Sequence, residues 1–506
     1  MKRSQLNAGV ILSYFTLVVN TVVQLVYTPI IIRILGKNEY GLYTLVGSVV
    51  NYLSLCGFGM AGSYLRFYSV YLKEGNKEKI ASLNGIFLIL NVIAASISIF
   101  LGNYLTNNIG YILGSELTSL ELERAKLLME ILVINIALSF PNSVFDSVLI
   151  SQECFGFQRG IRLATAVMNP FMGIPLLLLG YGSVALVCVT TLLTILNLFV
   201  NGYYCIKHLH MRVSFKYIDY ALIKQIVIFS FFIFINMIID QVNWNVDKFL
   251  LGRYWGTATV AVYGVAAQIN SLYMQCSTAV SSVFAPIVNR YTAENTAENR
   301  QKINELFVFV GRMQFIILML ILSGIIFFGR FFIRLWVGEG YDEAYVVVLL
   351  LIVPVTIPLI QSLGIEIQRA QNKHHVRSIV YFCMMILNLI ISIFLSKAYG
   401  AVGAATGTSI SLILGNGLFM NYYYQKCLCV NVIRFWKEIF KIFPALIIPL
   451  LFGSCVMRIQ DISSFVRLCI LITCYCSIYA ISIWLFGIKE TEKVEIKNRV
   501  KKLDRK

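Results

Sequence analysis

The chain has 506 residues, of which 58% are hydrophobic and 13% are charged, and its mean hydropathy is +0.76. Soluble domains carry about twice this share of charged residues, so the composition excludes an ordinary soluble protein. The net charge of +17 does not require a nucleic-acid partner. In an integral membrane protein, such an excess arises from cytoplasmic loops and from attraction to anionic lipid.

Apolar runs of about 20 residues recur along the whole chain, which is the length that an α-helix needs to cross a bilayer. The alternating pattern of a membrane β-barrel is absent from the sequence. The sequence therefore predicts an all-α integral membrane protein with about 14 transmembrane helices. The predicted spans are residues 10–32, 40–63, 83–104, 127–150, 161–180, 184–205, 225–250, 258–286, 307–329, 344–364, 378–396, 401–424, 440–457 and 465–487.

An even number of spans places both termini on the same side of the membrane. Most of the 42 Lys and Arg residues lie at the N-terminus, in the even-numbered connections and in the C-terminal tail. Because basic loops are retained on the cytoplasmic side, we expect both termini to be cytoplasmic.

The sequence contains an internal repeat. Residues 18–36 match residues 234–252, and the match continues at a nearly constant offset, pairing Tyr40-Gly41 with Tyr263-Gly264. Such a duplication predicts two pseudo-symmetric six-helix bundles of parallel topology. We expect an N-terminal bundle in 1–222, a C-terminal bundle in 223–428, two appended helices in 429–487 and a basic cytoplasmic tail in 488–506.

The predicted helix 225–250 carries a polar stripe within its apolar run. At about 100° per residue, four of its polar positions fall within about 60° of one another: Asn236, Asp240, Asn243 and Asp247. An ionisable group near the bilayer centre costs about 2.5–3.5 kcal/mol, so Asp240 must be kept from lipid. We expect the stripe, with the adjacent Lys248, to face an aqueous cavity. The alternative is hydrogen bonding between helices, worth about 0.6 kcal/mol per contact.

The first predicted helix has a matching stripe. Asn20, Gln24 and Tyr27 follow one another at i, i+4 and i+7, and the repeat aligns Asn20 with Asn236 and Gln24 with Asp240. We therefore expect these three side chains to line the same cavity from the opposite side.

Three acids within predicted spans are candidates for binding a coupling cation or proton: Asp240, Asp247 and Asp146. A coupling carboxylate must differ in protonation or ion occupancy between two states of the protein. For Asp146 a structural role is an equal alternative, because it could pair with a basic group elsewhere in the bundle.

Basic residues gather at the predicted cytoplasmic ends of the helices. Arg66 and Arg290 occupy matching positions in the two halves, and Arg369 lies in the run GIEIQRAQNKHHVRS, residues 364–378. Guanidinium and ammonium groups suit phosphate oxygens. The alternative is that they only mark the cytoplasmic side and extend toward the interface.

Motifs of soluble enzymes are absent from the sequence, which has no G-x-x-x-x-G-K-[ST], H-E-x-x-H or G-x-S-x-G. We expect no catalytic residue, no metal site and no cofactor other than a coupled H⁺ or Na⁺. The protein is therefore not expected to be an enzyme.

Two segments carry a family resemblance. RILGKNEYGLYTLVGSVVNYLSLCGFGMAGSYLRFYS (33–69) resembles the N-terminal signature of Wzx-type bacterial polysaccharide flippases, and LGIEIQRAQNKHHVRS (363–378) is similar to a segment of their capsule members. These flippases belong to the multidrug/oligosaccharidyl-lipid/polysaccharide exporter (MOP) superfamily, and the resemblance covers essentially the whole chain.

The resemblance implies a transporter in the bacterial inner membrane. Two bundles would rock about a central cavity and move an undecaprenyl-diphosphate-linked oligosaccharide outward, for O-antigen, capsule or exopolysaccharide synthesis. The diphosphate would meet Arg or Lys, for which Arg33 joins the three arginines above. The implied partners are this substrate, membrane lipids and other polysaccharide assembly proteins.

Three other functions remain open. A cation-coupled multidrug antiporter of the same superfamily typically stops at twelve spans. A membrane polysaccharide polymerase or glycosyltransferase usually has a sizeable external loop with catalytic residues, whereas the largest predicted external loop here is 105–126. A scaffold in an envelope assembly complex would not explain the polar stripe.

Overall fold

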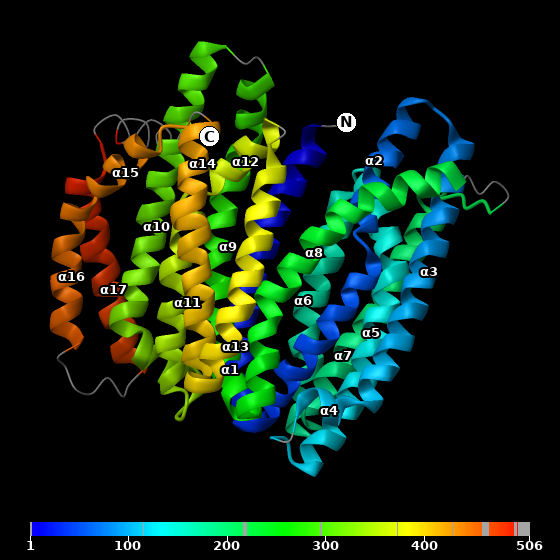
Figure 1. Cartoon of the computed structure of the whole chain (residues 1–506), viewed down its shortest axis with the longest axis horizontal. Helices are drawn as coiled ribbons and strands as arrows, with labels where there is room; N and C mark the ends of the chain where they lie inside the picture. Colours follow the sequence, from blue (N-terminus) through cyan, green and yellow to red (C-terminus); the bar gives the residue numbers. More distant parts are fainter. Residues whose placement is uncertain are drawn as a thin grey trace. The chain divides into compact units, whose positions relative to one another are not determined.

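A computed structural model describes residues 3–114, 116–215, 220–293, 296–371, 373–428, 430–457, 465–489 and 493. Over these residues the regular structure is helical and includes no strand, which confirms the predicted all-α fold (Figure 1). The predicted basic tail, 488–506, lies outside the described residues except for 488, 489 and 493.

The helices follow one another with short connections. Up to residue 255 they are α1 (Arg3–Asn51), η1 (Tyr52–Gly57), α2 (Met60–Lys73), α3 (Lys77–Asn107), α4 (Ile109–Leu113), α5 (Ser119–Ser151), α6 (Phe155–Leu178), α7 (Gly182–Lys207) and α8 (Tyr220–Trp255). The remainder are α9 (Thr257–Ala293), α10 (Ala297–Val337), α11 (Asp342–Ile360), α12 (Ser362–Ala370), α13 (His374–Leu412), η2 (Ile413–Met420), α14 (Asn421–Cys427), α15 (Val432–Phe440), α16 (Phe443–Met457), α17 (Phe465–Ser482) and η3 (Ile483–Gly487).

Two of the long helices are broken at a glycine. In α1, Gly36 has φ 76° and ψ 174°, and in α13, Gly400 has φ 55° and ψ −133°. Glycine reaches these positive φ values without the steric cost that a Cβ imposes. Both breaks fall between predicted spans, the first between 10–32 and 40–63 and the second between 378–396 and 401–424. Each of these two helices thus corresponds to two predicted spans.

Ten helices of the described chain are long and apolar enough to cross a membrane, or eleven if the bent pair α15–α16 counts as one span. The predicted number of fourteen is therefore not confirmed. Two of the ten stretches, Phe15–Lys73 and His375–Cys427, contain the breaks described above. A further predicted span, 258–286, lies within α9.

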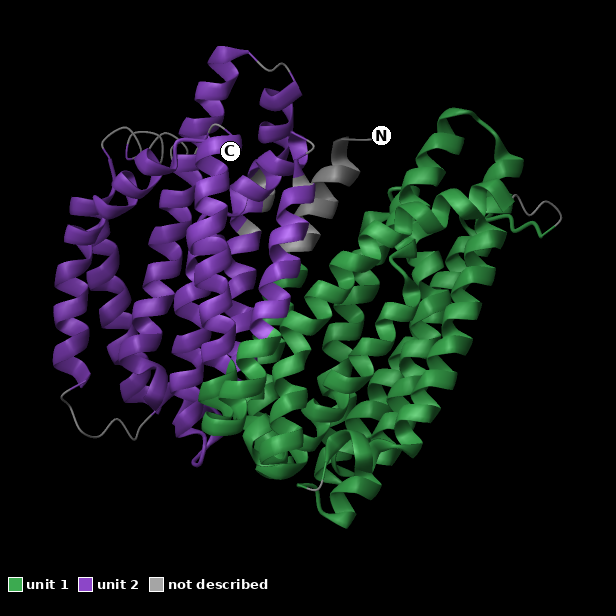
Figure 2. Cartoon of the chain, in the orientation of Figure 1, with its two compact units in different colours: residues 1–264, 389–404 green, residues 265–388, 405–506 purple. Residues whose placement is uncertain are grey.

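The chain forms two compact units (Figure 2). Unit 1 comprises residues 1–264 and 389–404, and unit 2 comprises 265–388 and 405–506. Compactness thus assigns α8 and the start of α9 to unit 1, whereas the repeat divides the chain at residue 222. The division by repeat remains a prediction.

The core of unit 1 joins α2, α3 and α5. Tyr64 and Phe87 are almost fully buried, and their rings meet edge to face with centroids 5.1 Å apart. The Tyr64 hydroxyl donates to Asn84 Oδ1 (2.6 Å), and Asn84 Nδ2 donates to the carbonyl of Arg212 (2.8 Å). The polar groups of this core are paired, as burial requires.

In unit 2 a buried arginine of α10 forms hydrogen bonds with α15 and η3. Arg312 is 2% exposed, and its guanidinium donates to the carbonyls of Glu438 in α15 (2.8 Å) and Gly487 in η3 (2.9 Å). The Glu438 carboxylate lies 3.7 Å from this guanidinium and 2.6 Å from the ammonium groups of Lys441 and Lys489. Backbone carbonyls and a carboxylate therefore compensate the buried charge.

Candidate functional site

The polar stripe lies along α8 in unit 1 and passes from exposed to buried positions. Asn236 and Asp240 are exposed, Asn243 is half-buried, and Asp247 is 1% exposed. Asn236 Nδ2 donates to the carbonyl of Phe232 one turn earlier (2.8 Å). The first half of the stripe is therefore accessible, and its end lies inside the unit.

Asp247 has a defined partner in the next helix. Its Oδ2 accepts a hydrogen bond from the hydroxyl of Tyr263 in α9 at 2.6 Å. Lys248, the next residue, is half-buried. A buried carboxylate held by a tyrosine is well placed to fix α8 against α9, so of the two acids of the stripe, Asp240 is the accessible one.

The opposite side of α8 carries a second set of polar contacts, which the sequence analysis missed. Gln241 Nε2 donates to Ser54 Oγ of η1 (3.0 Å), and Asn245 Nδ2 donates to Gln241 Oε1 (2.7 Å). Nearer the start of the helix, Ser230 and Ser63 of α2 exchange a hydrogen bond. This side of α8 contacts η1 through an amide and α2 through a hydroxyl, which is the interhelical hydrogen bonding first considered for the stripe.

On α1, all three predicted side chains are half-buried: Asn20, Gln24 and Tyr27. The hydroxyl of Tyr27 lies against Gly173 of α6, where a Cβ would collide with it. Tyr27 therefore faces α6, and the close approach of the two helices depends on that glycine.

Asp146 belongs to a polar group formed by α5, α6 and α7. Its Oδ2 lies 4.0 Å from the guanidinium of Arg162, and Asn201 Nδ2 donates to Asn142 Oδ1 (3.0 Å) and Asp146 Oδ1 (3.4 Å). Arg162 is the kind of basic group that we expected opposite this acid. The geometry fits a structural pair, and the coupling role remains a prediction.

Unit 2 contains a corresponding amide pair. Gln361 Nε2 donates to Asn421 Oδ1 (2.7 Å), which also accepts from Trp436 Nε1 (2.9 Å). Gln361 and Asn421 follow Asn142 and Asn201 at nearly the offset of the repeat. In each unit, a hydrogen bond between two amides thus joins segments that the predicted repeat places at nearly matching positions.

Two of the predicted phosphate-binding arginines lie against aromatic rings. Arg66 is exposed, and its guanidinium carbon is 4.4 Å from the ring centroid of Phe229 in α8. Arg290 is exposed at the end of α9, 5.4 Å from the ring of Tyr291. Arg66 was expected at the end of a helix but lies in the middle of α2. Cation–π contact holds each side chain against a ring and leaves the edge of the guanidinium able to donate.

The other two predicted arginines are also exposed. Arg369 at the end of α12 forms an ion pair with Glu366 at 3.0 Å. Arg33 lies on α1 shortly before the break at Gly36.

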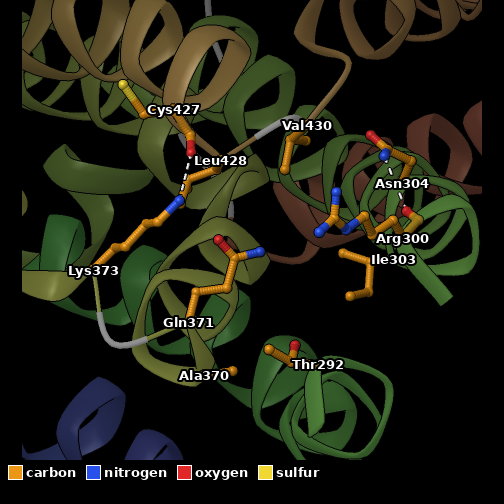
Figure 3. A pocket seen from close by; sticks show the side chains of 10 residues that line it. All are labelled: Thr292, Arg300, Ile303, Asn304, Ala370, Gln371, Lys373, Cys427, Leu428 and Val430. Carbon is orange, nitrogen blue, oxygen red and sulfur yellow. Dashed lines mark hydrogen bonds between the residues drawn. The ribbon is translucent and has the colours of Figure 1, made fainter. Parts of the chain in front are cut away.

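A cavity of about 400 Å³ lies in unit 2, where α10 begins and α12 and α14 end (Figure 3). Three of its residues, Ala370, Gln371 and Lys373, fall in the basic run 364–378, whereas Arg300 was not singled out from the sequence. The lining consists of Thr292, Arg300, Ile303, Asn304, Ala370, Gln371, Lys373, Cys427, Leu428 and Val430. Over the described part of the chain, no group of three or more His, Cys, Asp or Glu side chains could hold a metal ion.

Comparison with known proteins places the chain in a family. Residues 30–346, more than half of the chain, match the family described as "Polysaccharide biosynthesis protein". The chain belongs to this family. The match includes the segment 33–69 on which the resemblance first rested.

Two relatives of this polysaccharide biosynthesis protein cover most of its length. A candidate O-antigen transporter of Shigella flexneri is 21% identical over 403 residues, which are 78% of this chain and 92% of that protein. The membrane protein EpsK of Bacillus subtilis (strain 168) is 22% identical over 438 residues, 79% of each chain.

Solved structures share the fold of this polysaccharide biosynthesis protein. The lipid II flippase MurJ, in an inward closed conformation, superposes with a TM-score of 0.68 over 94% of this chain and 98% of its own, at 17% identity. An inward-facing multidrug MATE transporter of the MOP superfamily gives 0.64 over 83% and 99%, at 14% identity. The resemblance to the MOP superfamily is thereby confirmed for the fold.

Proposed function

We propose that the protein is a transporter that moves an undecaprenyl-diphosphate-linked oligosaccharide from the cytoplasmic to the outer leaflet, for cell-surface polysaccharide synthesis. Membership of the polysaccharide biosynthesis family and the similarity to an O-antigen transporter support this proposal. The observation that carries it is the pair of exposed polar side chains, Asn236 and Asp240, within the long apolar helix α8. A helix surrounded by lipid would not keep them there.

The side chains suit such a substrate. Carboxamides both donate and accept hydrogen bonds, and a carboxylate accepts them, so Asn20, Gln24, Asn236 and Asp240 match the hydroxyls of a glycan. Arg66, exposed in the middle of α2, and Arg290, exposed near the end of α9, offer donors to a diphosphate. No bond of the substrate has to be broken, so translocation by alternating access needs binding groups and no catalytic ones.

The distribution of charge supports an orientation of the chain, and with it a side on which substrate would be loaded. The basic connections support cytoplasmic termini, and the cytoplasmic leaflet of the bacterial inner membrane is where a lipid-linked glycan would be loaded. Asp240 is the proposed coupling group, because it is the accessible acid of the stripe. A proton or Na⁺ bound there would bias the equilibrium between two states.

Asp240→Asn tests this proposal, because it removes the charge and keeps the size of the side chain. Asp342→Asn is the matched control, since Asp342 lies at the start of α11 and pairs with Arg330 at 3.7 Å. In proteoliposomes loaded with lipid-linked oligosaccharide, we expect Asp240→Asn to slow the appearance of glycan at the outer surface at least about tenfold, equivalent to about 1.4 kcal/mol. Asp342→Asn should leave the rate unchanged.

The outcomes separate the two parts of the proposal. Normal translocation by Asp240→Asn, at a normal protein level, would overturn the coupling role. Failure of the wild-type protein to translocate any lipid-linked glycan would overturn the function. Proton- or Na⁺-driven efflux of a cationic dye from the same vesicles would instead favour the multidrug antiporter, the class whose fold the protein shares.

A further inference from the structure

The cavity at the end of unit 2 has a lining suited to an anion. Arg300 from the first turn of α10 and Lys373 from the connection before α13 supply two positive charges, and no acid is among the described residues that line it. In Figure 3 the guanidinium of Arg300 and the amide of Gln371 extend into the hollow from opposite sides. The hydroxyl of Thr292 and the amide of Asn304 add further polar groups.

Neighbouring contacts hold these groups in place. Lys373 Nζ donates to the carbonyl of Cys427 at the end of α14 (2.8 Å). This bond uses one of the three N–H donors of the Lys373 ammonium. Asn304 Nδ2 donates to the carbonyl of Arg300 (3.0 Å), and Asn304 Oδ1 accepts from the backbone N–H of Asn431 (2.7 Å). These contacts fix the positions of Lys373 and Asn304 beside the cavity.

The arrangement is specific to Arg300 and is not shared by every cation of the same helix. Lys302, two residues further along α10, points its ammonium at Glu298, 2.6 Å away. Its charge is matched by that carboxylate, and Lys302 is not part of the cavity lining. Lys302 is therefore a cation of the same helix that lies outside the cavity.

We propose that this cavity binds a phosphate group through Arg300 and Lys373. A guanidinium fork and an ammonium are the two side chains that proteins use for phosphate oxygens. The volume of about 400 Å³ lies within the range of small-ligand pockets, so the phosphate can carry part of the molecule to which it is attached. The phosphate belongs either to the headgroup of an anionic phospholipid or to a water-soluble phosphate compound. This site lies outside the α8 stripe and goes beyond the proposed transport function.

Binding to the purified full-length protein in an uncharged detergent tests the proposal. The probes are inorganic phosphate and dihexanoyl phosphatidylglycerol below its micelle concentration, each titrated calorimetrically against a chloride background of constant ionic strength. Loss of a charge-assisted hydrogen bond weakens binding by about tenfold or more, so we expect this loss for Arg300→Gln and for Lys373→Gln. Lys302→Gln removes the same charge from the same helix and should bind as the wild type does.

Conservative variants guard against a change of fold. Lys373 also contacts the end of α14, so Lys373→Arg and Arg300→Lys, which keep the charge, should retain most of the affinity. Binding of phosphatidylglycerol without inorganic phosphate supports a lipid headgroup, and binding of both supports a soluble phosphate compound. Absence of binding of either probe, or equal losses for Arg300→Gln and Lys302→Gln, would overturn the site. These binding measurements are independent of the translocation assay for Asp240, so the site and the proposed function can fail separately.

Discussion

Alanine at Gly41 should destabilise unit 1, whereas alanine at Gly264, its counterpart in the predicted repeat, should be tolerated. A Cβ at Gly41 would come well within 3.0 Å of the backbone carbonyl of Thr257 at the start of α9. A backbone oxygen cannot rotate away, so one helix would have to move. A Cβ at Gly264 would meet the side chains of Thr44 and Tyr40 at 3.6 and 3.7 Å, which is ordinary van der Waals contact.

The expected difference between the two variants can be worked out from these contacts. Overpacking a close contact costs about 1–3 kcal/mol. Replacing glycine by alanine inside a helix gains about 1 kcal/mol where space is available. We assume that alanine gains this helix stability at residue 264 and not at residue 41. Gly41→Ala should therefore be less stable than Gly264→Ala by about 2–4 kcal/mol.

Thermal unfolding of the full chain in detergent, followed by the loss of the monodisperse peak in size-exclusion chromatography, measures this difference. We expect a lower midpoint for Gly41→Ala and a midpoint equal to or above the wild type for Gly264→Ala. Gly47→Ala is a second control, because a Cβ there would meet no atom within 4 Å. If Gly41→Ala unfolds at the same temperature as both controls, the close approach of α1 and α9 is refuted.

Two further predictions concern arginines. Arg312→Met should lower the unfolding midpoint far more than Arg330→Met in the same chromatographic assay. Breaking a buried, hydrogen-bonded ion pair costs about 3–5 kcal/mol, whereas an exposed pair contributes about 1 kcal/mol or less. Equal midpoints would contradict the role given to Arg312. Arg66→Glu and Arg290→Glu should each slow glycan translocation in proteoliposomes by repelling the diphosphate, and unchanged rates for both would mean that they mark the cytoplasmic side only.

The sequence predicted the helical membrane fold because apolar runs of bilayer length are a strong signal. It also predicted where α1 and α13 break, near Gly36 and Gly400, since a short polar or small-residue stretch interrupts each run. The periodicity of α8 placed Asn236 and Asp240 on one side of the helix. It did not predict that Asp247 would be buried against Tyr263, because that contact depends on how the next helix packs.

Most of the contacts that sequence reasoning missed were missed for one reason. Membrane helices are apolar on most sides, so hydrophobic periodicity carries little information about which helices touch. The contact of Tyr27 with α6 and that of Gln241 with η1 are of this kind. For Arg312 a signal was available, since a lone arginine in the apolar run 307–329 must have a buried partner. Nothing in the sequence distinguishes Arg300 from the other basic residues at helix ends.

The amide pairs Asn142–Asn201 and Gln361–Asn421 have a consequence for how this protein can change shape. The first joins α5 to α7, and the second joins the residue between α11 and α12 to α14. Sliding at either place would break a hydrogen bond, which inside a membrane no water would replace. Deformation is cheaper at Gly36 and Gly400, where the helical hydrogen bonds are already interrupted. The two amide pairs therefore limit movement within each unit, and bending is expected at the two glycine breaks.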